Sequence, residues 1–564
     1  MLDYISPGFV NSINPAQPTP YSIVVIGKVL HTVLCMAKIV LLRPPGVDVA
    51  SSFLRARVVP PLALAYLAGA LRAKGHTPLP LDALGEGRHE SGVSYTPKAR
   101  FRGLSNTTVI ERLKELAPFD GIAVTSMFSQ DWPHQHALLR DIEKEFPNIP
   151  VIVGGEHATA AATYILETTP SVSFTARGEG EETIVDFADW CDSVRPISDI
   201  AGVSYRSEDG SVATNPNRAR MTKLEDIPRP AWDLFDMEMY LTDADPFGVE
   251  RGRSMPILAT RGCPYRCTFC SSPQMWTTRY VMRDPADVVD EIEGYIKTYK
   301  ADNIDFYDLT AVVRKSWILA FCTEVEKRNL KFTYQLPSGT RSEALDSEVL
   351  HAMYRTGCRN LTYAPESGSR NTLEVIKKKV DLDKITDSIK EAVKAGIVVK
   401  INLIIGFPKE RRRDVYKTLL YCWKLALVGI DDGGVYLFSP YPGTELYEYL
   451  RTTGKIPNMS DEYFATLLHY SDITVGSSYC ENINEKELGF YRTLGMAVFY
   501  GLAYLRRPGR IVRTVKNLRA NRAESSFESR LSGMLQRRAV DKASDRAYKK
   551  EQTKKPVSPD LIHQ

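Results

Sequence analysis

The sequence predicts an α/β protein made of two successive units, a doubly wound parallel sheet and then a partial (β/α)6 barrel, followed by a mostly helical carboxyl-terminal region. Three observations lead to this prediction. At 564 residues the chain is too long for a single hydrophobic core. Short apolar runs typical of buried strands alternate with segments of helical period. Glycine and polar residues follow many of these runs, as at the ends of parallel strands.

The composition is typical of a folded globular protein, with 43% hydrophobic and 25% charged residues. A formal net charge of +4 is small for this length and does not suggest a nucleic-acid-binding protein. Nine cysteines, an odd number, do not suggest the disulfide framework of a small secreted protein. The amino-terminal segment lacks the pattern of a signal peptide, so we expect a cytoplasmic protein.

Residues 1–35 are expected to form an extension outside the fold. The run from residue 21 to residue 36 is apolar, but Lys28 and His31 interrupt it, and it is too short to span a membrane. Met36 leads directly into an apolar run and would itself serve as a start.

The first unit is predicted over residues 36–200. Its first strand is the apolar run 38–42, which ends at Arg43-Pro44-Pro45-Gly46. Val59-Pro60-Pro61 then begins a helix that runs to residue 74. Strands and helices continue to alternate, as a parallel doubly wound sheet requires. The strands are predicted at 77–82, 119–126, 149–153 and 174–176, and the helices at 111–116 and 136–146.

Polar or glycine-rich segments follow several of these strands, where ligands bind in doubly wound sheets. They are Thr125-Ser126, Gly154-Gly155-Glu156-His157 and Arg177-Gly178-Glu179-Gly180-Glu181. Glycine at such a position lets the backbone approach a ligand closely. The alternative interpretation is that these glycines only form tight turns between a strand and a helix.

Residues 201–250 are predicted to connect the two units. Segments 202–206 and 211–214 read as the two strands of a β-hairpin, joined by a turn that contains Gly210. The proline-rich stretch 227–233 follows as a linker.

The second unit, residues 251–455, is predicted to be a partial barrel of six strand–helix units. Strand 256–260 leads into a cysteine-containing loop, and Asp284-Pro285 begin a helix that runs to about residue 299. Functional residues of such barrels lie at the carboxyl ends of the strands. The remaining strands are predicted at 303–307, 331–335, 360–363, 398–405 and 434–438.

Three cysteines, Cys263, Cys267 and Cys270, lie in one short loop with the spacing C-x3-C-x2-C. A cubane [4Fe–4S] cluster normally takes four thiolates, so three leave one iron able to bind a small molecule. A structural zinc ion would need four ligands. The nearest spare cysteines, Cys322 and Cys358, lie in predicted helices without paired spacing, so we favour the iron–sulfur cluster.

The chain resembles the cobalamin-binding radical S-adenosylmethionine (SAM) family in this cysteine loop, in Arg43-Pro44-Pro45, in the stretch 60–68 and in the glycine-rich segments. That family includes magnesium-protoporphyrin monomethyl ester cyclase-like and hopanoid methylase-like enzymes. The resemblance implies a Rossmann-like cobalamin-binding domain, a radical SAM barrel, and three cofactors: a [4Fe–4S] cluster on the three cysteines, SAM and cobalamin. The residues that it assigns to cobalamin are Pro44, Pro60, Thr125, Ser126, Gly154, Gly155, His157, Gly178, Glu179 and Gly180.

The cobalt-ligating motif D-x-H-x-x-G is absent, since Asp131-Trp132-Pro133-His134 has a different spacing. Members of this class commonly lack the motif, so the residue that faces the lower side of cobalt stays unassigned. Asp308 falls where the family often has two acids, and here the second is missing. The resemblance places SAM against Phe269, Asp308, Glu366, Ser367, Gly368, Asn402, Gly406 and Tyr441.

The implied activity is reductive cleavage of SAM to a 5′-deoxyadenosyl radical, with methyl transfer from methylcobalamin to an unactivated carbon. A cyclase, ring-rearranging or oxidising enzyme with the same cofactors is the alternative. A non-catalytic cobalamin-binding sensor is an alternative of another class. A methylthiotransferase is rejected because it would carry a second cysteine triad, and only Cys35 and Cys191 lie upstream. The expected partners are a small-molecule substrate, lipid-like or a natural-product intermediate, and an electron donor such as flavodoxin or ferredoxin.

The carboxyl-terminal region is predicted to be helical over 456–522 and to end in a basic, disordered tail over 523–564. The positive charge of the chain is concentrated here, because residues 505–564 contain 16 Lys and Arg against 6 Asp and Glu.

Segment 488–505 carries a single charged residue, Arg492, and Arg506-Arg507 follow it. Two interpretations stay open for this segment. It lies on an anionic membrane, giving a peripheral contact through 488–522, or it packs as a helix on the mouth of the barrel.

Overall fold

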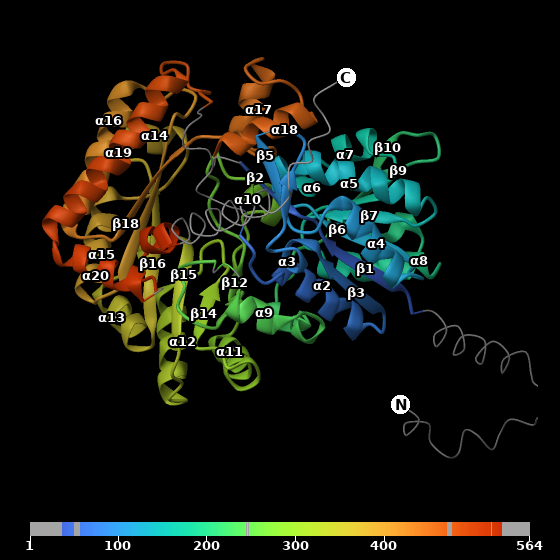
Figure 1. Cartoon of the computed structure of the whole chain (residues 1–564), viewed down its shortest axis with the longest axis horizontal. Helices are drawn as coiled ribbons and strands as arrows, with labels where there is room; N and C mark the ends of the chain where they lie inside the picture. Colours follow the sequence, from blue (N-terminus) through green and yellow to red (C-terminus); the bar gives the residue numbers. More distant parts are fainter. Residues whose placement is uncertain are drawn as a thin grey trace, which may run out of the picture.

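The computed structural model describes residues 36–49, 57–96, 98–243, 245, 247–470, 477–520 and 522–532. These residues form two α/β units that lie side by side, the first in blue to cyan and the barrel in green to orange (Figure 1). The predicted extension over residues 1–35 and the predicted tail beyond residue 532 lie outside the described residues.

The first unit is built on a seven-stranded sheet with the order β10-β9-β8-β7-β6-β1-β3. Its parallel strands are β1 (Lys38–Arg43), β3 (Thr77–Asp82), β6 (Gly121–Thr125), β7 (Val151–Gly154) and β8 (Phe174–Ala176). In this order the direction of winding reverses between β1 and β6. Ligands of doubly wound sheets bind at such a reversal, outside the carboxyl ends of the strands.

Helices cover both faces of this sheet, because successive side chains of a strand point to opposite sides. The helices are α2 (Leu62–Ala73), α4 (Asn106–Leu116), α5 (Trp132–Glu145), α7 (Ala162–Thr168) and α8 (Glu181–Cys191). Ile39 and Leu41 of β1 pack in the core that α2 and α8 complete. Val40 and Leu42 face the opposite core, with α4, α5 and α7. The predicted doubly wound architecture is confirmed.

The predicted hairpin is present as β9 (Val203–Arg206) and β10 (Val212–Thr214). Strand β9 pairs antiparallel with β8, so the hairpin extends the first sheet instead of standing apart as a connector. A second, three-stranded antiparallel sheet, which the sequence patterns do not predict, joins β2 (Gly46–Val49), β5 (Ala99–Arg102) and β4 (Ser91–Val93).

The second unit is the predicted six-stranded parallel half-barrel, with its strands in chain order (Figure 1). The strands are β11 (Ser254–Ile257), β14 (Asn303–Phe306), β15 (Thr333–Thr340), β16 (Cys358–Glu366), β17 (Val398–Ile405) and β18 (Asp432–Leu437). The helices that cover its outer face include α11 (Pro285–Tyr299), α12 (Lys315–Lys327), α13 (Ser347–Arg355), α14 (Arg370–Val375), α15 (Leu382–Lys394) and α16 (Arg412–Val428).

The placement of Cys358 in a helix is wrong. Gly357 has φ +114°, a conformation that ends the turn after α13, and Cys358 is the first residue of β16. Its side chain is fully buried in the core of the barrel.

The carboxyl-terminal helices are α17 (Glu445–Thr452), α18 (Asp461–Thr466), α19 (Glu485–Arg506) and α20 (Gly509–Arg519). Helix α19 packs on α16 and β18, and glycines allow the close approach: a Cβ at Gly495 would lie 2.7 Å from the side chain of Leu419. Of the two interpretations of segment 488–505, the structure therefore shows the packed helix. In the described part of the chain, no helix has the length and apolar character needed to cross a bilayer.

Residues 523–532 differ from the expected tail, because they pack on the barrel. The Glu528 carboxylate is fully buried and accepts hydrogen bonds from the side chains of Thr514 and Asn517, at 2.8 and 2.9 Å. Residues 526–532 are helical, and the amides of Ser526 and Phe527 donate to Asp432 at the start of β18.

Candidate active site

The cysteine loop lies between β12 (Thr260–Arg261) and α10 (Ser272–Trp276) and is held by distant segments. The Thr268 amide donates to the Ile376 carbonyl at 3.0 Å, and the Thr268 carbonyl accepts from the Leu446 amide at 2.9 Å. Gly262 has φ +85°, and a Cβ there would overlap with the backbone of Arg279. The clamped loop brings the three thiols within electrostatic reach of one another.

Burial opposes ionisation of two of the three thiols. Burial raises the pKa of Cys267 and of Cys270, the latter to about 12. Lys378 and Arg341 act in the opposite direction on the pKa of Cys267. Within the described ranges, no three His, Cys, Asp or Glu side chains are arranged so that they could bind one metal ion. The donor set of three thiols still fits a [4Fe–4S] cluster, since iron favours thiolates and the nearby cations offset their charge.

Two cations beside this loop were not found from the sequence. Lys378 lies 2.9 Å from the carboxylate of Glu366, and both side chains are buried. Arg341, which follows β15, stacks 3.4 Å from the ring centroid of Tyr265. The position of Arg341 at a strand end is a signal that could have identified it. Lys378 stands in a run of three lysines, which is typical of a solvated surface.

Glu366, one of the residues predicted to contact SAM, lies at the carboxyl end of β16. Its φ of +66° is unusual for a residue other than glycine. Its side chain is buried and turned toward Lys378, so this carboxylate carries a compensated charge next to the cysteine loop.

Asp308 holds the backbone just before the cysteine loop. One carboxylate oxygen accepts from the amide and the hydroxyl of Thr260, both at 2.5 Å, and the other accepts from the Ala259 amide at 3.2 Å. Burial raises the pKa of Asp308 to about 6. Both oxygens have partners within the protein, so these contacts give Asp308 a positioning role, and its contact with SAM stays a prediction.

Ser367 and Gly368 face helix α16. The Ser367 hydroxyl lies 2.8 Å from that of Thr418, which also accepts from the Gly368 amide at 3.1 Å. A Cβ at Gly368 would lie 2.6 Å from the carbonyl oxygen of Lys417. The glycine is therefore needed for close packing of strand end and helix, and the predicted contacts of Ser367 and Gly368 with SAM stay predictions.

Asn402 lies within β17, three residues before the strand ends, whereas Phe269 and Tyr441 lie in the loops after β12 and β18. The Asn402 side-chain oxygen is buried without a hydrogen-bond partner among the described residues, so it is available to accept a hydrogen bond from a bound ligand. The Phe269 ring packs 5.7 Å from that of Phe407, and Tyr441 packs in the same apolar cluster.

Gly406 begins the loop after β17 with φ +88°, and Glu410 holds this loop. The Glu410 carboxylate accepts from the amides of Gly406 and Phe407, at 2.6 and 3.3 Å, and from the Thr372 hydroxyl at 3.1 Å. Burial raises the pKa of Glu410 from about 4.5 to about 7.

Glu410 is expected to make stability depend on pH. Because its pKa is raised on folding, the folded state binds the proton more tightly, and the free energy of unfolding falls as pH rises from about 4.5 to about 7. The Glu410→Gln variant should lose this slope, worth roughly 3 kcal/mol over the window. Urea unfolding at several pH values measures it, with the exposed Glu445→Gln as control. An unchanged slope in Glu410→Gln would contradict the assignment.

The two units meet at helix α10, which follows the cysteine loop. The Ser271 hydroxyl donates to the Glu156 carboxylate, in the glycine-rich segment after β7. The Gly178 amide donates to the Thr159 hydroxyl at 3.1 Å, and this hydroxyl lies 3.3 Å from the sulfur of Met275. The strand ends of the first sheet are thus placed directly against the cysteine loop.

The loop after β18 reaches the same place. Gly443, two residues beyond Tyr441, has φ +84°, and a Cβ there would overlap with the side chain of Gln274 in α10. The same Cβ would lie 3.0 Å from that of Ala160, in the first unit.

A buried ion network joins the first unit to the residue that precedes the cysteine loop. The Arg261 guanidinium contacts Glu179 at 3.2 Å and also pairs with Glu181. Glu179 is held from the other side by Arg220 at 3.0 Å. All four side chains are buried. Glu179, predicted to contact cobalamin, is therefore engaged in fixing the two units together.

Most of the remaining residues assigned to cobalamin lie where a strand ends or a helix begins. Thr125, Ser126, Gly154 and Gly155 lie together at the ends of β6 and β7, and a Cβ at Gly155, where φ is +114°, would lie 2.5 Å from the Ser126 carbonyl. Pro44 and Pro60 are buried where β1 ends and α2 begins; Gly180 precedes α8.

His157 does not reach the strand ends. Its ring packs among aromatic residues, 5.1 Å from the ring centroid of Trp132 and 4.9 Å from that of Phe464. Its Nδ1 lies 2.9 Å from the Ser129 hydroxyl, and burial lowers its pKa to about 3. A neutral core histidine is the role that these contacts indicate, because α6 (Glu156–Ala160) turns this side chain inward.

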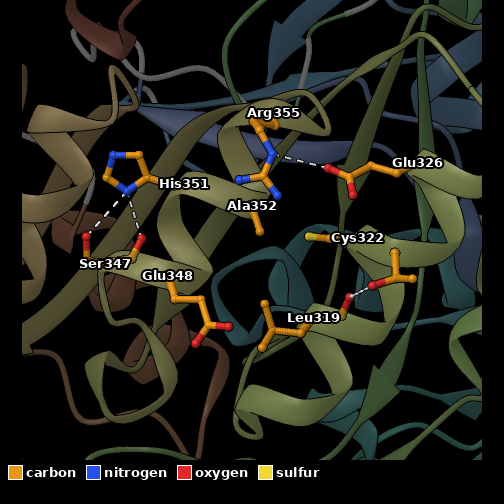
Figure 2. A pocket seen from close by; sticks show the side chains of 9 residues that line it. Leu319, Cys322, Glu326, Ser347, Glu348, His351, Ala352 and Arg355 are labelled. Carbon is orange, nitrogen blue, oxygen red and sulfur yellow. Dashed lines mark hydrogen bonds and ion pairs between the residues drawn. The ribbon is translucent and has the colours of Figure 1, made fainter.

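A pocket of about 530 Å³ lies on the outer face of the barrel between α12 and α13 (Figure 2). Arg355 pairs with Glu326 across it at 3.2 Å, and His351 turns back to Ser347 of its own helix. The Cys322 thiol is buried, which raises its pKa. The pocket is on the helix side of the sheet, so it takes no part in the site at the strand ends.

Two family models match this chain, one for each unit. The B12 binding domain model matches residues 55–188, and the radical SAM superfamily model matches residues 257–422. An uncharacterized methyltransferase of Pyrococcus horikoshii is 29% identical over 409 residues, covering 72% of this chain and 82% of that protein. The anaerobic magnesium-protoporphyrin IX monomethyl ester cyclase of Rubrivivax gelatinosus is 26% identical over 396 residues, covering 69% of this chain and 66% of that protein.

The fold has a counterpart among solved structures. The radical SAM methyltransferase TsrM from Kitasatospora setae, solved with cobalamin and a [4Fe–4S] cluster bound, matches with a TM-score of 0.56 at 18% identity. The match covers 74% of this chain and 78% of that one, so the order and arrangement of both units are shared. With both family models matched in the order in which the two sheets occur, the chain is an enzyme of the cobalamin-binding radical SAM family.

Proposed function

We propose that this enzyme transfers a methyl group to an unactivated carbon of a small molecule. The observation that carries the proposal is the contact of the first sheet with the cysteine loop through Glu156 and Ser271. This contact puts the strand ends expected to bind cobalamin beside the loop expected to bind the cluster. A substrate bound at this junction would lie between the proposed cobalamin and cluster sites.

The three cysteines are proposed to hold the [4Fe–4S] cluster, with SAM beside Phe269, Glu366 and Asn402. The bound cluster and SAM supply a 5′-deoxyadenosyl radical, and bound cobalamin supplies the methyl group. The chain itself fixes the geometry: Asp308 and the Arg261 network hold the loop before the cysteines, and Glu410 holds the loop after β17. The aromatic rings at the barrel end exclude water from the reacting atoms.

For cobalamin we propose the ends of β1, β6, β7 and β8. Pro44, Thr125, Gly154 and Gly178 line these ends, and a Cβ at Gly178 would meet only the Met275 carbonyl, at 3.7 Å. His157 and Glu179 support these loops from behind. A flavodoxin or ferredoxin is the proposed electron donor.

The proposal is tested by following the methyl group. Cells with and without the gene are fed methionine carrying a CD₃ group, and extracts are compared by mass spectrometry. A product found only with the gene should be three mass units heavier after labelling. Complementation with the Cys267→Ala variant is the control and should restore no product.

A cyclase or oxidising enzyme is the second candidate, supported by the similarity to the protoporphyrin ester cyclase. The same experiment separates the two. A product that depends on the gene but gains no labelled methyl group would contradict methyl transfer and favour the second candidate.

We also propose that α20 contacts an anionic membrane. Its exposed apolar residues Ile511 and Val512, together with Leu505, stand among the cations of this basic region. Val512 is 71% exposed. Such a combination of apolar and basic side chains binds at the headgroup boundary of anionic bilayers.

The Val512→Glu variant should bind phosphatidylserine-containing vesicles roughly tenfold more weakly than the native protein, because a charge that anionic lipids repel replaces apolar area that the bilayer would cover. Co-sedimentation measures this, and Val375→Glu, another exposed valine, is the matched control. Equal sedimentation of native protein with neutral and anionic vesicles would contradict the contact.

A further inference from the structure

Met127 and Phe128 are large apolar residues that the functions above do not use. They follow β6 directly and are 44% and 56% exposed, whereas apolar side chains of this size are commonly buried. The winding of the first sheet reverses between β1 and β6, so both residues stand where ligands of doubly wound sheets bind. An exposed apolar surface at this position is suited to cover an apolar face of a ligand.

The Met127 side chain lies across the ends of two neighbouring strands. The Ser126 amide donates to the Gly154 carbonyl at 2.7 Å, and the Ser126 carbonyl accepts from the His157 amide at 3.1 Å. These two bonds fix the backbone just before Met127. A Cβ at Gly155 would lie 3.2 Å from the Met127 sulfur. The thioether therefore extends from the end of β6 over the loop that follows β7.

Glycines leave the backbone of these strand ends uncovered. At Gly155 a side chain would meet the Met127 sulfur, and φ of +114° favours glycine there. A Cβ at Gly154 or Gly178 would find its nearest neighbour only at 3.5 or 3.7 Å. A flat macrocycle can approach such a surface closely, so these residues fit the corrin ring of cobalamin, with the Met127 thioether against the ring.

The three histidines that follow β6 in the first unit are held elsewhere. The Nδ1 atom of His134 lies 2.9 Å from the Ser94 hydroxyl, and that of His136 lies 2.8 Å from the Asp461 carboxylate. The His157 ring packs among aromatic residues, as described above. All three side chains are at most 7% exposed, so a corrin on the exposed strand ends would not contact their ring nitrogens.

We propose that Met127 covers the lower face of cobalt in bound cobalamin, in the place where the D-x-H-x-x-G motif would supply a nitrogen ligand. The thioether is a weak donor. The identity of the axial ligand is a lever on the potential of a metal held in a macrocycle, and a thioether in place of a nitrogen favours the reduced metal. This inference rests on the proposed function, because it uses the cobalamin site proposed there, and it adds the residue below the metal.

Electron paramagnetic resonance tests this position directly. The full-length protein is loaded with cobalamin, and the cobalt is brought to its paramagnetic Co(II) state. A nitrogen nucleus bound to this cobalt splits the lines into triplets, which sulfur does not. The native protein should show no nitrogen triplet. Met127→His should introduce one, because an imidazole at this position would reach the cobalt and bind it.

Phe128→His is the matched control. Phe128 is exposed like Met127 and is its neighbour, but its backbone is extended, so successive side chains point to opposite sides. Its spectrum should match that of the native protein. A nitrogen triplet in the native protein or in Phe128→His, or none in Met127→His, would overturn the inference.

Met127→Ala tests the same position if the histidine variant binds no cobalamin. Removal of the thioether should let water reach the lower face, which shifts the cobalt hyperfine splitting away from that of the native protein. A native spectrum in Met127→Ala would contradict the position of the thioether. Both Met127 variants change an exposed side chain, so they should fold like the native protein.

These spectra do not depend on turnover, so the two proposals can fail separately. If Met127→His gains the triplet and no CD₃-labelled product forms with the native gene, methyl transfer fails and the assignment of Met127 stands. If the labelled product forms and Met127→His gains no triplet, methyl transfer stands and the assignment of Met127 fails.

Discussion

An anaerobically reconstituted Cys267→Ala variant is expected to fall from about four irons per chain to about one or fewer, and to form no detectable 5′-deoxyadenosine. Three thiolates of one loop are the expected cluster ligands, and the remaining two cannot hold a cubane. Iron analysis and chromatography of the SAM products measure the two effects.

Cys322→Ala is the control for this variant, because Cys322 is a buried cysteine that lies on the outer side of the barrel. It should keep its iron and its activity. A Cys267→Ala protein that still holds four irons would show that another group completes the cluster and would contradict the assignment of this loop.

The Arg261→Met variant is expected to lose about 3 to 5 kcal/mol of stability, because it leaves Glu181 buried without its cation and Glu179 paired with Arg220 alone. Urea unfolding should show the loss, and because the ion network joins the two units, they should separate at lower urea than in the native protein. The double variant Arg261→Met/Glu181→Gln should recover part of the loss, since it removes one of the uncompensated charges.

Arg253→Met is the matched control. Arg253 pairs with Glu238 at 2.7 Å, but the Glu238 side chain is 67% exposed, so breaking this pair should cost far less stability than breaking the Arg261 network. Equal effects of Arg261→Met and Arg253→Met would mean that the buried network does not join the units.

The sequence predicts the strands of both sheets well, because each is a compact apolar run bounded by glycine, proline or polar residues. Strand 398–405 and strand 174–176 match β17 and β8 end to end. The cysteine loop can likewise be recognised from the sequence, because the cluster that we expect there depends on the spacing of the three cysteines alone. The pairing of β2 with β5 cannot be predicted from the sequence. It joins segments some fifty residues apart, and each segment is too short to show a clear hydrophobic pattern of its own.

Roles within the site are harder to predict than positions. Asp308 and Glu179 stand at strand ends, where carboxylates commonly bind ligands, yet both are engaged by partners distant in sequence, Thr260 and Arg261. Lys378 and Arg341 acquire their significance only when the chain folds them against Cys267. Local pattern fixes which residues reach the site, whereas tertiary contacts decide what each one does there.

The docking of residues 526–532 on β18 bears on how the enzyme is assembled. A ribosome makes these residues after every strand of both sheets, so the side of the barrel that holds Arg530 is completed late in synthesis. Until then the interior is less enclosed, and a bulky cofactor has a wider route to the cysteine loop. A cofactor that enters before residues 526–532 dock therefore meets a more open barrel than one that enters afterwards.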